Sequence, residues 1–263
     1  MEIIVCIKQV PDTETKIKLK PDGSDIESEG IKWIISPYDE YAIEEGIKIK
    51  EKLGGTVTIV SLGPKRAIEA IRTGLAMGAD KAIHLSDPAY LTADTFAVAN
   101  ALAAAIKTIP HDIILCGRQS IDDDSAQVPS MLAELLSVGQ ANFVIKLEVS
   151  QDKKAIAYRT VEGGAQEVLD IDLPAVIAVT KGINEPRYAS LPGIMKAKQK
   201  KVDEPAPSAL NLDANAVGEK GAKSKVVKYA LPPERKAGKI IQSDFPQNVQ
   251  DLVKLLREEA KII

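Results

Sequence analysis

The feature that most constrains the fold lies near the middle of the chain, at residues 111–136, where an apolar run leads into a polar loop and then a helical pattern. The run from Ile113 to Cys116 has the length and β-branched content of a buried strand, and Gly117 ends it. Apolar residues recur at helical spacing from Val128. In a parallel sheet, this order places free backbone N–H groups and a positive helix end where phosphate groups bind.

The polar loop also has simpler interpretations. Asp124 or Ser125 can serve as the N-cap of the helix, with the aspartates solvated. If an anion binds here, we expect it on backbone amides and on Ser125 or Gln127, with the three carboxylates at 122–124 turned away. A metal site at 122–124 is a third alternative, and it is the weakest because no second ligand cluster lies nearby in the sequence.

The composition limits the class of protein. Hydrophobic residues make up 45% of the 263 residues, which excludes global disorder and suggests one large domain, with or without an arm. Aromatic residues make up only 4%, so the core has to be aliphatic, as in a parallel sheet. A net charge of -3 gives no reason to expect nucleic acid binding. Cys6 and Cys116 lie in apolar runs, so we interpret them as buried thiols in a reducing compartment. Without a transmembrane run or a signal peptide, we expect no membrane insertion and a cytoplasmic protein.

Strand and helix patterns alternate regularly through the first half of the chain. This alternation, with short connections, predicts an α/β fold with a parallel, doubly wound sheet. The expected strands lie at residues 2–8, 56–61, 81–85 and 113–116. Helices are expected from an N-cap at Ser36 with Pro37 in the first turn, after Pro64, and from a cap at Thr92. A hairpin insertion is expected from residues 16–20 and 31–35 around a turn at 21–23.

Three loops are expected to meet at the carboxyl edge of this sheet. They lie at residues 9–13, which form a polar turn, at 62–65 and at 118–125. Loops that converge at this edge form the crevice in which doubly wound proteins bind ligands. The sequence therefore predicts a site for a nucleotide-sized ligand.

The second half of the chain has a different pattern. An antiparallel meander is expected at residues 143–149, 155–161 and 166–169, followed by a buried strand at 174–180. We predict a nucleotide-binding domain over residues 1–200 and an extended arm over 201–263. The arm is expected to contain a linker at 203–223, a short strand at 226–229 and an amphipathic helix at 246–263. The segment at 184–195 is either an ordinary surface loop or a docking loop with Leu191 or Met195 as an exposed anchor.

No pair of nucleophile and base stands out in the sequence. His84 and His111 are the two histidines, and neither lies in a polar, motif-like setting. Any redox chemistry therefore has to come from a bound cofactor.

Six motifs give the chain a family resemblance. They are IKQVPD at 7–12, SPYDEYAIEE at 36–45, SLGP at 61–64, IRTGLAMGAD at 71–80, GRQSIDDDSAQ at 117–127 and NEPRYASLPGIMKAK at 184–198. With these motifs the chain resembles the beta (small) subunit of the electron transfer flavoproteins over most of its length. The resemblance implies a Rossmann-like adenine-nucleotide-binding domain and a C-terminal arm that packs on the alpha subunit of a heterodimer. It also argues against a stand-alone nucleotide-binding regulatory protein on the same fold.

The resemblance implies specific site residues. The implied cofactor-binding residues are Cys6, Ile7, Lys8, Val10, Pro11, Asp12, Thr13, Ser36, Pro37, Tyr38, Asp39, Leu62, Gly63, Arg118, Gln119, Ser120, Ile121, Asp122, Asp123, Asp124, Ser125, Ala126, Gln127 and Val128. Adenine is expected near Cys6 and residues 36–39, and phosphates on residues 119–128. The implied partner-docking residues are Tyr188, Leu191, Pro192, Ile194 and Met195, of which Leu191 matches the leucine that family members insert into a partner dehydrogenase.

Two branches of the family differ in the nucleotide that they bind. In one, the beta subunit binds AMP as a structural ligand and docks a dehydrogenase. In the other, it binds FAD that accepts hydride from NADH and bifurcates the electrons. One electron goes to ferredoxin or flavodoxin, and the other passes through the alpha-subunit FAD to an acyl-CoA dehydrogenase-type or lactate dehydrogenase-type flavoenzyme. The segments 9–13 and 125–128 resemble the FAD branch, which we favour. Pro129, which lacks an N–H, departs from both branches.

Overall fold

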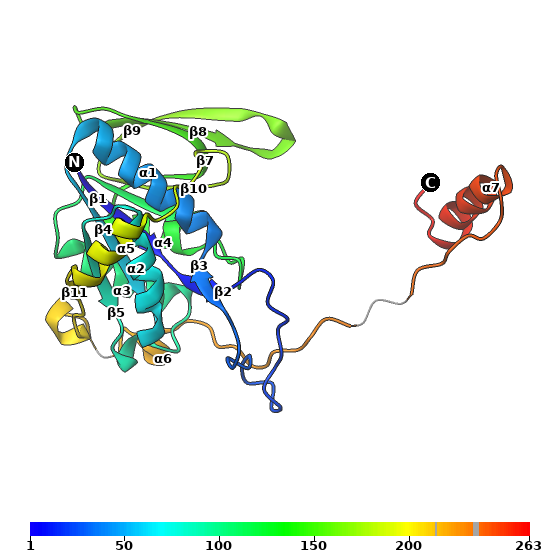
Figure 1. Cartoon of the computed structure of the whole chain (residues 1–263), viewed down its shortest axis with the longest axis horizontal. Coiled ribbons are helices and arrows are strands. Elements are labelled where there is room, and N and C mark those ends of the chain that lie inside the picture. Colours follow the sequence, from blue (N-terminus) through cyan, green and yellow to red (C-terminus); the bar gives the residue numbers. More distant parts are fainter. Residues whose placement is uncertain (214, 234–236) are drawn as a thin grey trace. The chain divides into compact units, whose positions relative to one another are not determined.

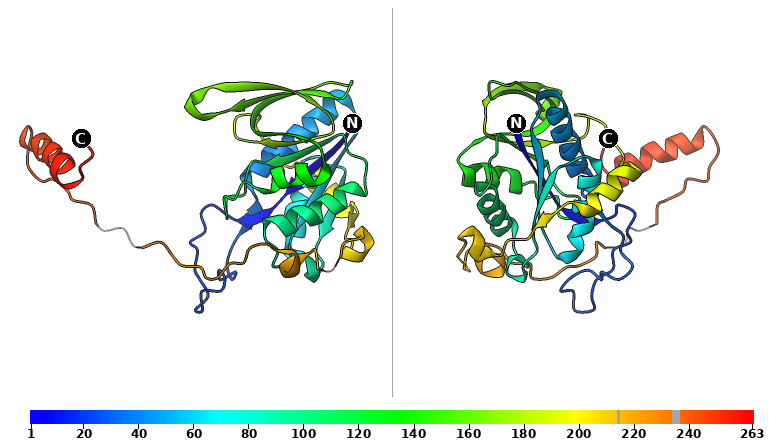
Figure 2. Two further views of the ribbon diagram at one scale, coloured as in Figure 1. Left: turned by 180° about the vertical axis from the view of Figure 1, so that it is seen from behind. Right: turned by 60° about the vertical axis from the view of Figure 1, so that its left-hand side comes forward.

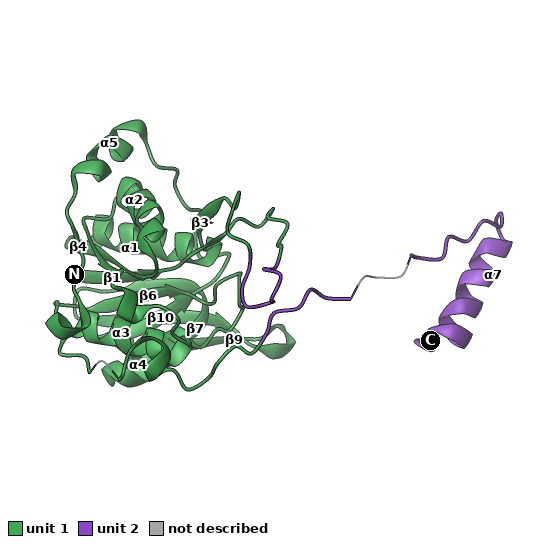
Figure 3. Cartoon of the chain, turned by 90° about the horizontal axis from the view of Figure 1, so that it is seen from below, with its two compact units in different colours: residues 1–18, 27–227 green, residues 19–26, 228–263 purple. Residues whose placement is uncertain are grey.

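A computed structural model describes residues 1–213, 215–233 and 237–263 of the chain (Figure 1). Within these residues the chain divides into two compact units (Figure 3). The larger unit contains residues 1–18 and 27–227, and the smaller contains residues 19–26 and 228–263.

A nine-stranded sheet forms the centre of the larger unit, in the order β11-β5-β4-β1-β6-β10-β7-β8-β9. Every pair from β11 to β7 is parallel, and β7, β8 and β9 are antiparallel, which confirms the predicted α/β fold and the predicted meander. The strands are β1 (Glu2–Ile7), β4 (Thr56–Leu62), β5 (Lys81–Leu85), β6 (Ile113–Gly117), β7 (Gly139–Val149), β8 (Lys154–Thr160), β9 (Gln166–Asp172), β10 (Ala175–Val179) and β11 (Val202–Asp203).

Helices cover both faces of the parallel part of the sheet (Figure 2 and Figure 3). One face carries α1 (Pro37–Leu53) and α2 (Ile68–Met77), and α5 (Leu191–Gln199) packs on α2. The opposite face carries α3 (Thr95–Lys107) and α4 (Val128–Leu136). Because the chain leaves β1 through α1 to reach β4, and returns through α3 to reach β6 on the other side of β1, the winding direction reverses beside β1. Ligand crevices form at such a reversal, outside the carboxyl ends of the strands.

The aliphatic core follows from the alternation of side chains along buried strands. In β1, Ile3 and Val5 point into the α1 and α2 layer, whereas Ile4 and Cys6 point into the α3 and α4 layer. All four residues are buried. A strand buried on both faces needs apolar residues at every position, which explains the near-continuous apolar runs in the sequence.

Two predicted helix starts are wrong. Asp94 rather than Thr92 caps α3, because its carboxylate accepts the backbone N–H of Ala97 at 2.9 Å. Thr92 instead has a left-handed backbone with φ of 58°. The N-cap of α4 is Gln127 and neither Asp124 nor Ser125. Pro37 does occupy the first turn of α1 after Ser36, although the Ser36 side chain makes no capping hydrogen bond.

The predicted polar turn at 9–13 and the hairpin insertion pair differently from expectation. Residues Gln9–Pro11 form β2, which pairs antiparallel with β3 (Trp33–Ile35). In the smaller unit, Leu19 bridges Ile26 around the turn. Each apolar segment of the expected hairpin therefore has a partner, but the two segments do not pair with each other.

Residues 203–223 are predicted to be a linker, but they contain short elements within the larger unit. These are β11 at the edge of the sheet, a 3-10 helix η4 (Pro207–Leu210) and α6 (Gly218–Gly221). Leu210 and Val217 are buried in the α3 and α4 layer, so apolar side chains hold this segment on the core. Residues 214 and 234–236 of the predicted arm lie outside the described residues. The expected strand at 226–229 is not formed.

The remaining short helices of the larger unit are 3-10 helices: η1 (Lys65–Ala67), η2 (Pro88–Tyr90) and η3 (Glu162–Gly164). The smaller unit contains the terminal helix, α7 (Gln247–Lys254), which continues into a π-helical turn, η5 (Leu255–Glu259). Its apolar side chains Val249, Leu252 and Val253 are exposed. None of the helices in the described ranges is long and apolar enough to cross a membrane.

Candidate nucleotide-binding site

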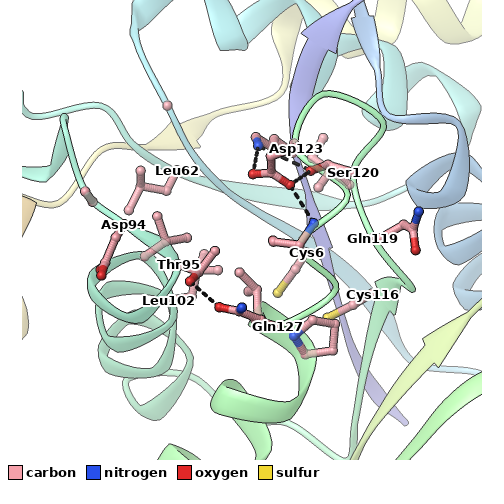
Figure 4. A pocket seen from close by; sticks show the side chains of 18 of the residues that line it. Cys6, Leu62, Asp94, Thr95, Leu102, Cys116, Gln119, Ser120, Asp123 and Gln127 are labelled. Atoms are coloured by element: carbon pink, nitrogen blue, oxygen red, sulfur yellow. Dashed lines mark hydrogen bonds and ion pairs between the residues drawn. The ribbon is translucent and has the colours of Figure 1, made fainter. Parts of the chain in front are cut away.

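A cavity of about 300 Å³ lies over the carboxyl ends of β1, β4 and β6 (Figure 4). It is at the carboxyl edge where the loops are predicted to converge, beside the reversal at β1, and its volume is at the lower end of the range for small-molecule sites. The predicted site residues that line it are Cys6, Ile7, Lys8, Asp39, Leu62, Gly63, Gln119, Ser120, Asp123, Ser125, Ala126, Gln127 and Val128. Residues from four separate segments of the sequence therefore meet at one cavity.

The other predicted site residues do not line the cavity. Val10 is fully buried and, with Pro11, belongs to β2, while Asp12 forms an ion pair with Lys32 at 2.7 Å and accepts a hydrogen bond from Thr13. Ser36 is fully buried before α1. The remaining residues lie beside the cavity in the first turn of α1 or in the loop after β6, and they are Pro37, Tyr38, Arg118, Ile121, Asp122 and Asp124.

Sequence reasoning missed one wall of the cavity. This wall is formed by the loop between β5 and α3, which contributes Tyr90, Leu91, Thr92, Ala93 and Asp94, together with Thr95, Val98 and Leu102 of α3. Outside this wall, the cavity is also lined by Pro64, which lies in the loop expected at 62–65, and by Cys116, Gly117 and Pro129, which are not among the implied cofactor-binding residues. The signal was available, because the loop after β5 also leaves the carboxyl edge of the parallel sheet.

A buried carboxylate joins the two strands beneath the cavity. Asp39, in the first turn of α1, accepts the backbone N–H of Lys8 at 2.7 Å and that of Gly117 at 3.1 Å. Burial raises the pKa of Asp39 to about 7, against the opposing effect of the two amide hydrogen bonds. Only glycine fits at position 117, because an added Cβ would lie 2.3 Å from Oδ1 of Asp39.

Lys8 neutralises the acidic part of the loop after β6. Its ammonium group lies 2.8 Å from Asp122 and 3.1 Å from Asp123, and it donates to Ser120 at 3.3 Å. Partial burial lowers the pKa of Lys8, but the two carboxylates outweigh this effect and raise it. Asp124 accepts a hydrogen bond from Gln119 at 2.7 Å. Within the described residues, no three His, Cys, Asp or Glu side chains gather as a metal ion would require.

Backbone donors remain free where α4 begins. None of the hydrogen bonds among the described residues engages the backbone N–H of Ala126, Gln127 or Val128. Asp124 and Ala126 adopt left-handed conformations with φ of 51° and 52°, so successive amides turn toward one side. Gln127 accepts a hydrogen bond from Thr95 at 2.8 Å through its side-chain oxygen, which leaves its amide nitrogen available as a donor. These donors, with the α4 dipole, suit an anionic group.

Hydrogen bonds connect the wall formed by the β5–α3 loop to the segment that precedes the smaller unit. Besides capping α3, Asp94 accepts the backbone N–H groups of Lys223 at 2.7 Å and Ser224 at 2.8 Å. The hydroxyl of the buried Tyr90 donates to the carbonyl of Pro205 at 3.1 Å, and burial raises the pKa of Tyr90 to about 12. His84, also buried, lies 3.1 Å from the carbonyl of Gly63 through Nε2 and so supports the turn that lines the cavity.

An aromatic cluster adjoins the loop after β6. The Arg118 guanidinium carbon lies 4.9 Å from the ring centroid of Tyr38 and 5.2 Å from that of Phe143. Phe143 lies at an irregularity of β7, has φ of 60° and is 39% exposed. The Nε atom of Arg118 is buried without a hydrogen-bond partner among the described residues. Two rings and a cation thus lie beside the cavity.

The predicted docking residues lie around the start of α5. Ser190 caps this helix by accepting the backbone N–H of Gly193 at 3.1 Å. Tyr188, Leu191 and Met195 are 98%, 79% and 71% exposed, and Ile194 is 42% exposed, whereas Pro192 lies in the first turn. A salt-bridged clamp holds the preceding segment on α1, because Arg187 donates to Glu44 at 2.8 Å and to Glu51 at 2.6 Å. Glu51 and Glu44 together raise the pKa of Arg187.

Together, the doubly wound fold, the cavity at its switch point and the free amides define an α/β protein with the features of a nucleotide-binding site. Comparisons with known proteins make the class specific. The model of the electron transfer flavoprotein domain matches residues 25–210. The chain is 43% identical to the electron transfer flavoprotein subunit beta of Thermoanaerobacterium thermosaccharolyticum, over 97% of this chain and 98% of that protein. It is 41% identical to the subunit beta of Bacillus subtilis over the full length of both chains, and 38% identical to that of Dictyostelium discoideum over 100% of this chain and 99% of that protein. The chain belongs to the electron transfer flavoprotein family and is a beta subunit of it.

Proposed function

We propose that the cavity binds the adenine end of FAD and that the chain works as the beta subunit of a bifurcating electron transfer flavoprotein. One observation carries the choice of FAD. The aromatic cluster of Arg118, Tyr38 and Phe143 adjoins the loop whose amides face the cavity. It offers a surface for a ring system beyond the phosphates.

The residues present fit the phosphates of such a dinucleotide. The free N–H groups of Ala126, Gln127 and Val128 supply donors, and the hydroxyl of Ser125 lies in the same wall. The carboxylates that would repel phosphate are bound to Lys8 and Gln119. Pro129 supplies no donor, so the expected phosphate contacts end at Val128.

Bound FAD would supply hydride acceptance from NADH and the division of two electrons between ferredoxin or flavodoxin and, through the alpha-subunit FAD, an acyl-CoA dehydrogenase-type or lactate dehydrogenase-type flavoenzyme. The chain's own residues bind and orient the nucleotide and dock the partner dehydrogenase. Asp39 holds the carboxyl ends of β1 and β6 in register through its two amide contacts. Lys8 binds Ser120, Asp122 and Asp123 of the acidic loop and so offsets part of its negative charge beside the phosphate donors.

The exposed apolar residues around α5 supply the proposed contact with the partner dehydrogenase. Leu191 is the best candidate for an anchor, since the Arg187 clamp and the Ser190 cap fix the backbone around a side chain that has no cover of its own. The exposed apolar face of α7 is proposed to pack on the alpha subunit in the heterodimer.

A specific observation favours the alternative nucleotide, AMP. The cavity volume of about 300 Å³ suits a mononucleotide better than a whole dinucleotide. With AMP bound, the chain would be a non-bifurcating beta subunit that supports the alpha subunit and docks a dehydrogenase.

The test is the nucleotide content of the purified heterodimer, measured by flavin absorbance and by chromatography of the released nucleotides. Two FAD per heterodimer without AMP would support the proposal and make NADH-driven ferredoxin reduction the next assay. One FAD with one AMP would refute it.

An Arg118→Gln variant should lose FAD from the beta subunit but retain AMP, since the guanidinium lies beside the rings of Tyr38 and Phe143 and outside the cavity. Arg159→Gln, which alters an arginine paired with Glu167 on β8 and β9, is the matched control.

A further inference from the structure

The two cysteines of the chain lie side by side under the cavity. Cys6 on β1 and Cys116 on β6 are register partners in adjacent parallel strands. Partners in such strands point to the same face of the sheet. Both cysteines are free, both belong to the α3 and α4 layer, and both line the cavity (Figure 4). The proposed electron transfer does not use either thiol.

The strand geometry brings the two thiols within bonding reach. Neighbouring strands lie about 4.8 Å apart, which falls inside the range of about 4.4–6.8 Å between the Cα atoms of disulfides. Parallel partners keep their Cβ atoms at nearly the same spacing, somewhat beyond the roughly 3.5–4.5 Å that a relaxed disulfide prefers. A bond between these sulfurs would therefore be strained and easily reduced.

Access to the sulfurs runs through the cavity. Cys6 is 7% exposed and Cys116 is 4% exposed. Both residues line the cavity, so a molecule that fills it covers their sulfurs. The state of the cavity therefore controls whether a small oxidant reaches them.

We propose that Cys6 and Cys116 form a reversible intrachain disulfide when the cavity is empty, and that a bound adenine nucleotide prevents it. The second half of this inference rests on the proposed function. The oxidant belongs to the class of peroxides.

The reaction has two balanced steps. The Cys6 thiolate attacks hydrogen peroxide, so that an S–O bond forms, the O–O bond breaks and the departing hydroxide takes a proton to become water. The Cys116 sulfur, after losing its proton, then attacks the sulfenic sulfur of Cys6. An S–S bond forms, the S–O bond breaks and a second water leaves. The two sulfurs together lose two electrons, and the peroxide gains them.

The surroundings of Cys116 make it a poor nucleophile for the first step. A hydrogen bond with Cys6, followed by burial, raises the pKa of the Cys116 thiol well above its usual value. A high pKa makes this thiol slow to react with a free oxidant. The second step is less affected, since it takes place within one chain between neighbouring groups.

The experiment uses the full-length chain in complex with its alpha subunit, with nucleotide bound and after its removal. Each sample receives hydrogen peroxide for a series of times, and remaining thiols are then alkylated under denaturing conditions. Mass spectrometry of this chain is the readout. In the empty complex, the mass of this chain should fall by two hydrogen atoms. Its cysteines should resist alkylation, and digestion should yield one linked peptide pair that contains Cys6 and Cys116. Added AMP and FAD, tested separately, should each slow this change at least tenfold, and dithiothreitol should reverse it.

Cys6→Ala and Cys116→Ala are the matched controls, and each should lose the linked peptide. If either variant fails to fold, the linked peptide pair of the wild-type chain still identifies the bond. Persistent alkylation of both cysteines in the empty complex would overturn the inference, as would oxygen added to single cysteines without linkage. Equal rates with and without bound nucleotide would overturn the protection while leaving the proposed function intact. Failure of both AMP and FAD to bind, measured by equilibrium dialysis, would refute the proposed function and the protection, while oxidation of the empty complex is still judged by its mass change.

Discussion

The buried carboxylate of Asp39 should make the stability of this chain fall as the pH rises. Its folded pKa of about 7 lies above the ordinary value of 3.8, so the folded chain binds more protons than the unfolded chain between these two values. The stability associated with Asp39 is therefore fully present below the unfolded pKa and is lost as the pH rises through about 7. The full difference corresponds to roughly 4 kcal/mol, of which about 2–3 kcal/mol falls between pH 5 and pH 8.

Replacement of Asp39 by Asn should remove this pH dependence. The Asn oxygen can accept the N–H of Lys8 or of Gly117, but its amide group faces the other donor, so we expect a constant loss of about 1–3 kcal/mol. The informative quantity is the change of the free energy of unfolding with pH, rather than its constant difference between the two proteins. Between pH 5 and pH 8, the free energy of unfolding of the wild-type chain should fall by about 2–3 kcal/mol more than that of Asp39→Asn.

Urea unfolding at several pH values, followed by the fluorescence of Trp33, measures this difference, and Trp33 is the only tryptophan in the sequence. Asp112→Asn is the matched control. Asp112 accepts the backbone N–H of Glu2 at 2.8 Å and forms an ion pair with Lys153; these contacts outweigh partial burial and lower its pKa, so it does not titrate between pH 5 and pH 8. Its curve should stay parallel to that of the wild type. Parallel curves for Asp39→Asn as well would refute the buried, high-pKa carboxylate.

Three further substitutions test the site and the docking surface. Gly117→Ala should destabilise the chain by about 1–3 kcal/mol in urea unfolding, because its Cβ would meet Asp39, whereas Gly139→Ala, whose Cβ meets nothing closer than 3.6 Å, should stay within about 1 kcal/mol. Arg187→Gln should leave the buried carboxylate of Glu44 without its cation, lower stability by about 1–3 kcal/mol and increase proteolysis of the segment before α5. Leu191→Ala should leave the free energy of unfolding unchanged, since the side chain is 79% exposed, but slow electron transfer to a partner dehydrogenase at least tenfold; an unchanged rate would contradict the docking proposal.

The parallel sheet and the crevice at its carboxyl edge could be predicted from the sequence because local patterns determine both. The apolar runs of β1, β4, β5 and β6 are long enough to be buried on both faces, and helical patterns separate them. Short connections and right-handed crossovers then leave few possible strand orders. The carboxyl-end positions of Lys8, Gly63 and Gln119 follow directly from this topology.

Pairings between segments that are not neighbours in the sequence could not be predicted in the same way. Residues 9–11 pair with residues 33–35 across an insertion, and nothing in either segment identifies the other. The ends of α3 and α4 depend on which carboxylate captures which N–H, and Asp123 accepts the N–H of Ser125 before that residue can begin the helix. Composition also misleads at residues 203–223, because Leu210 and Val217 are enough to hold a Pro- and Asn-rich segment on the core.

The cavity wall that the sequence analysis missed is formed by the loop after β5. In a parallel sheet every strand contributes a loop to the same edge, so the loop after β5 had the same claim as those after β1, β4 and β6. The sequence predicts only a helix start there, because Thr92 resembles an N-cap. Asp94 in fact has both roles, since one oxygen caps α3 and the other binds the backbone of Lys223 and Ser224. A cap that also binds a distant segment fixes the loop from both sides, and a fixed loop can serve as a cavity wall. The presence of a cap is therefore no reason to exclude the loop before it from a ligand site.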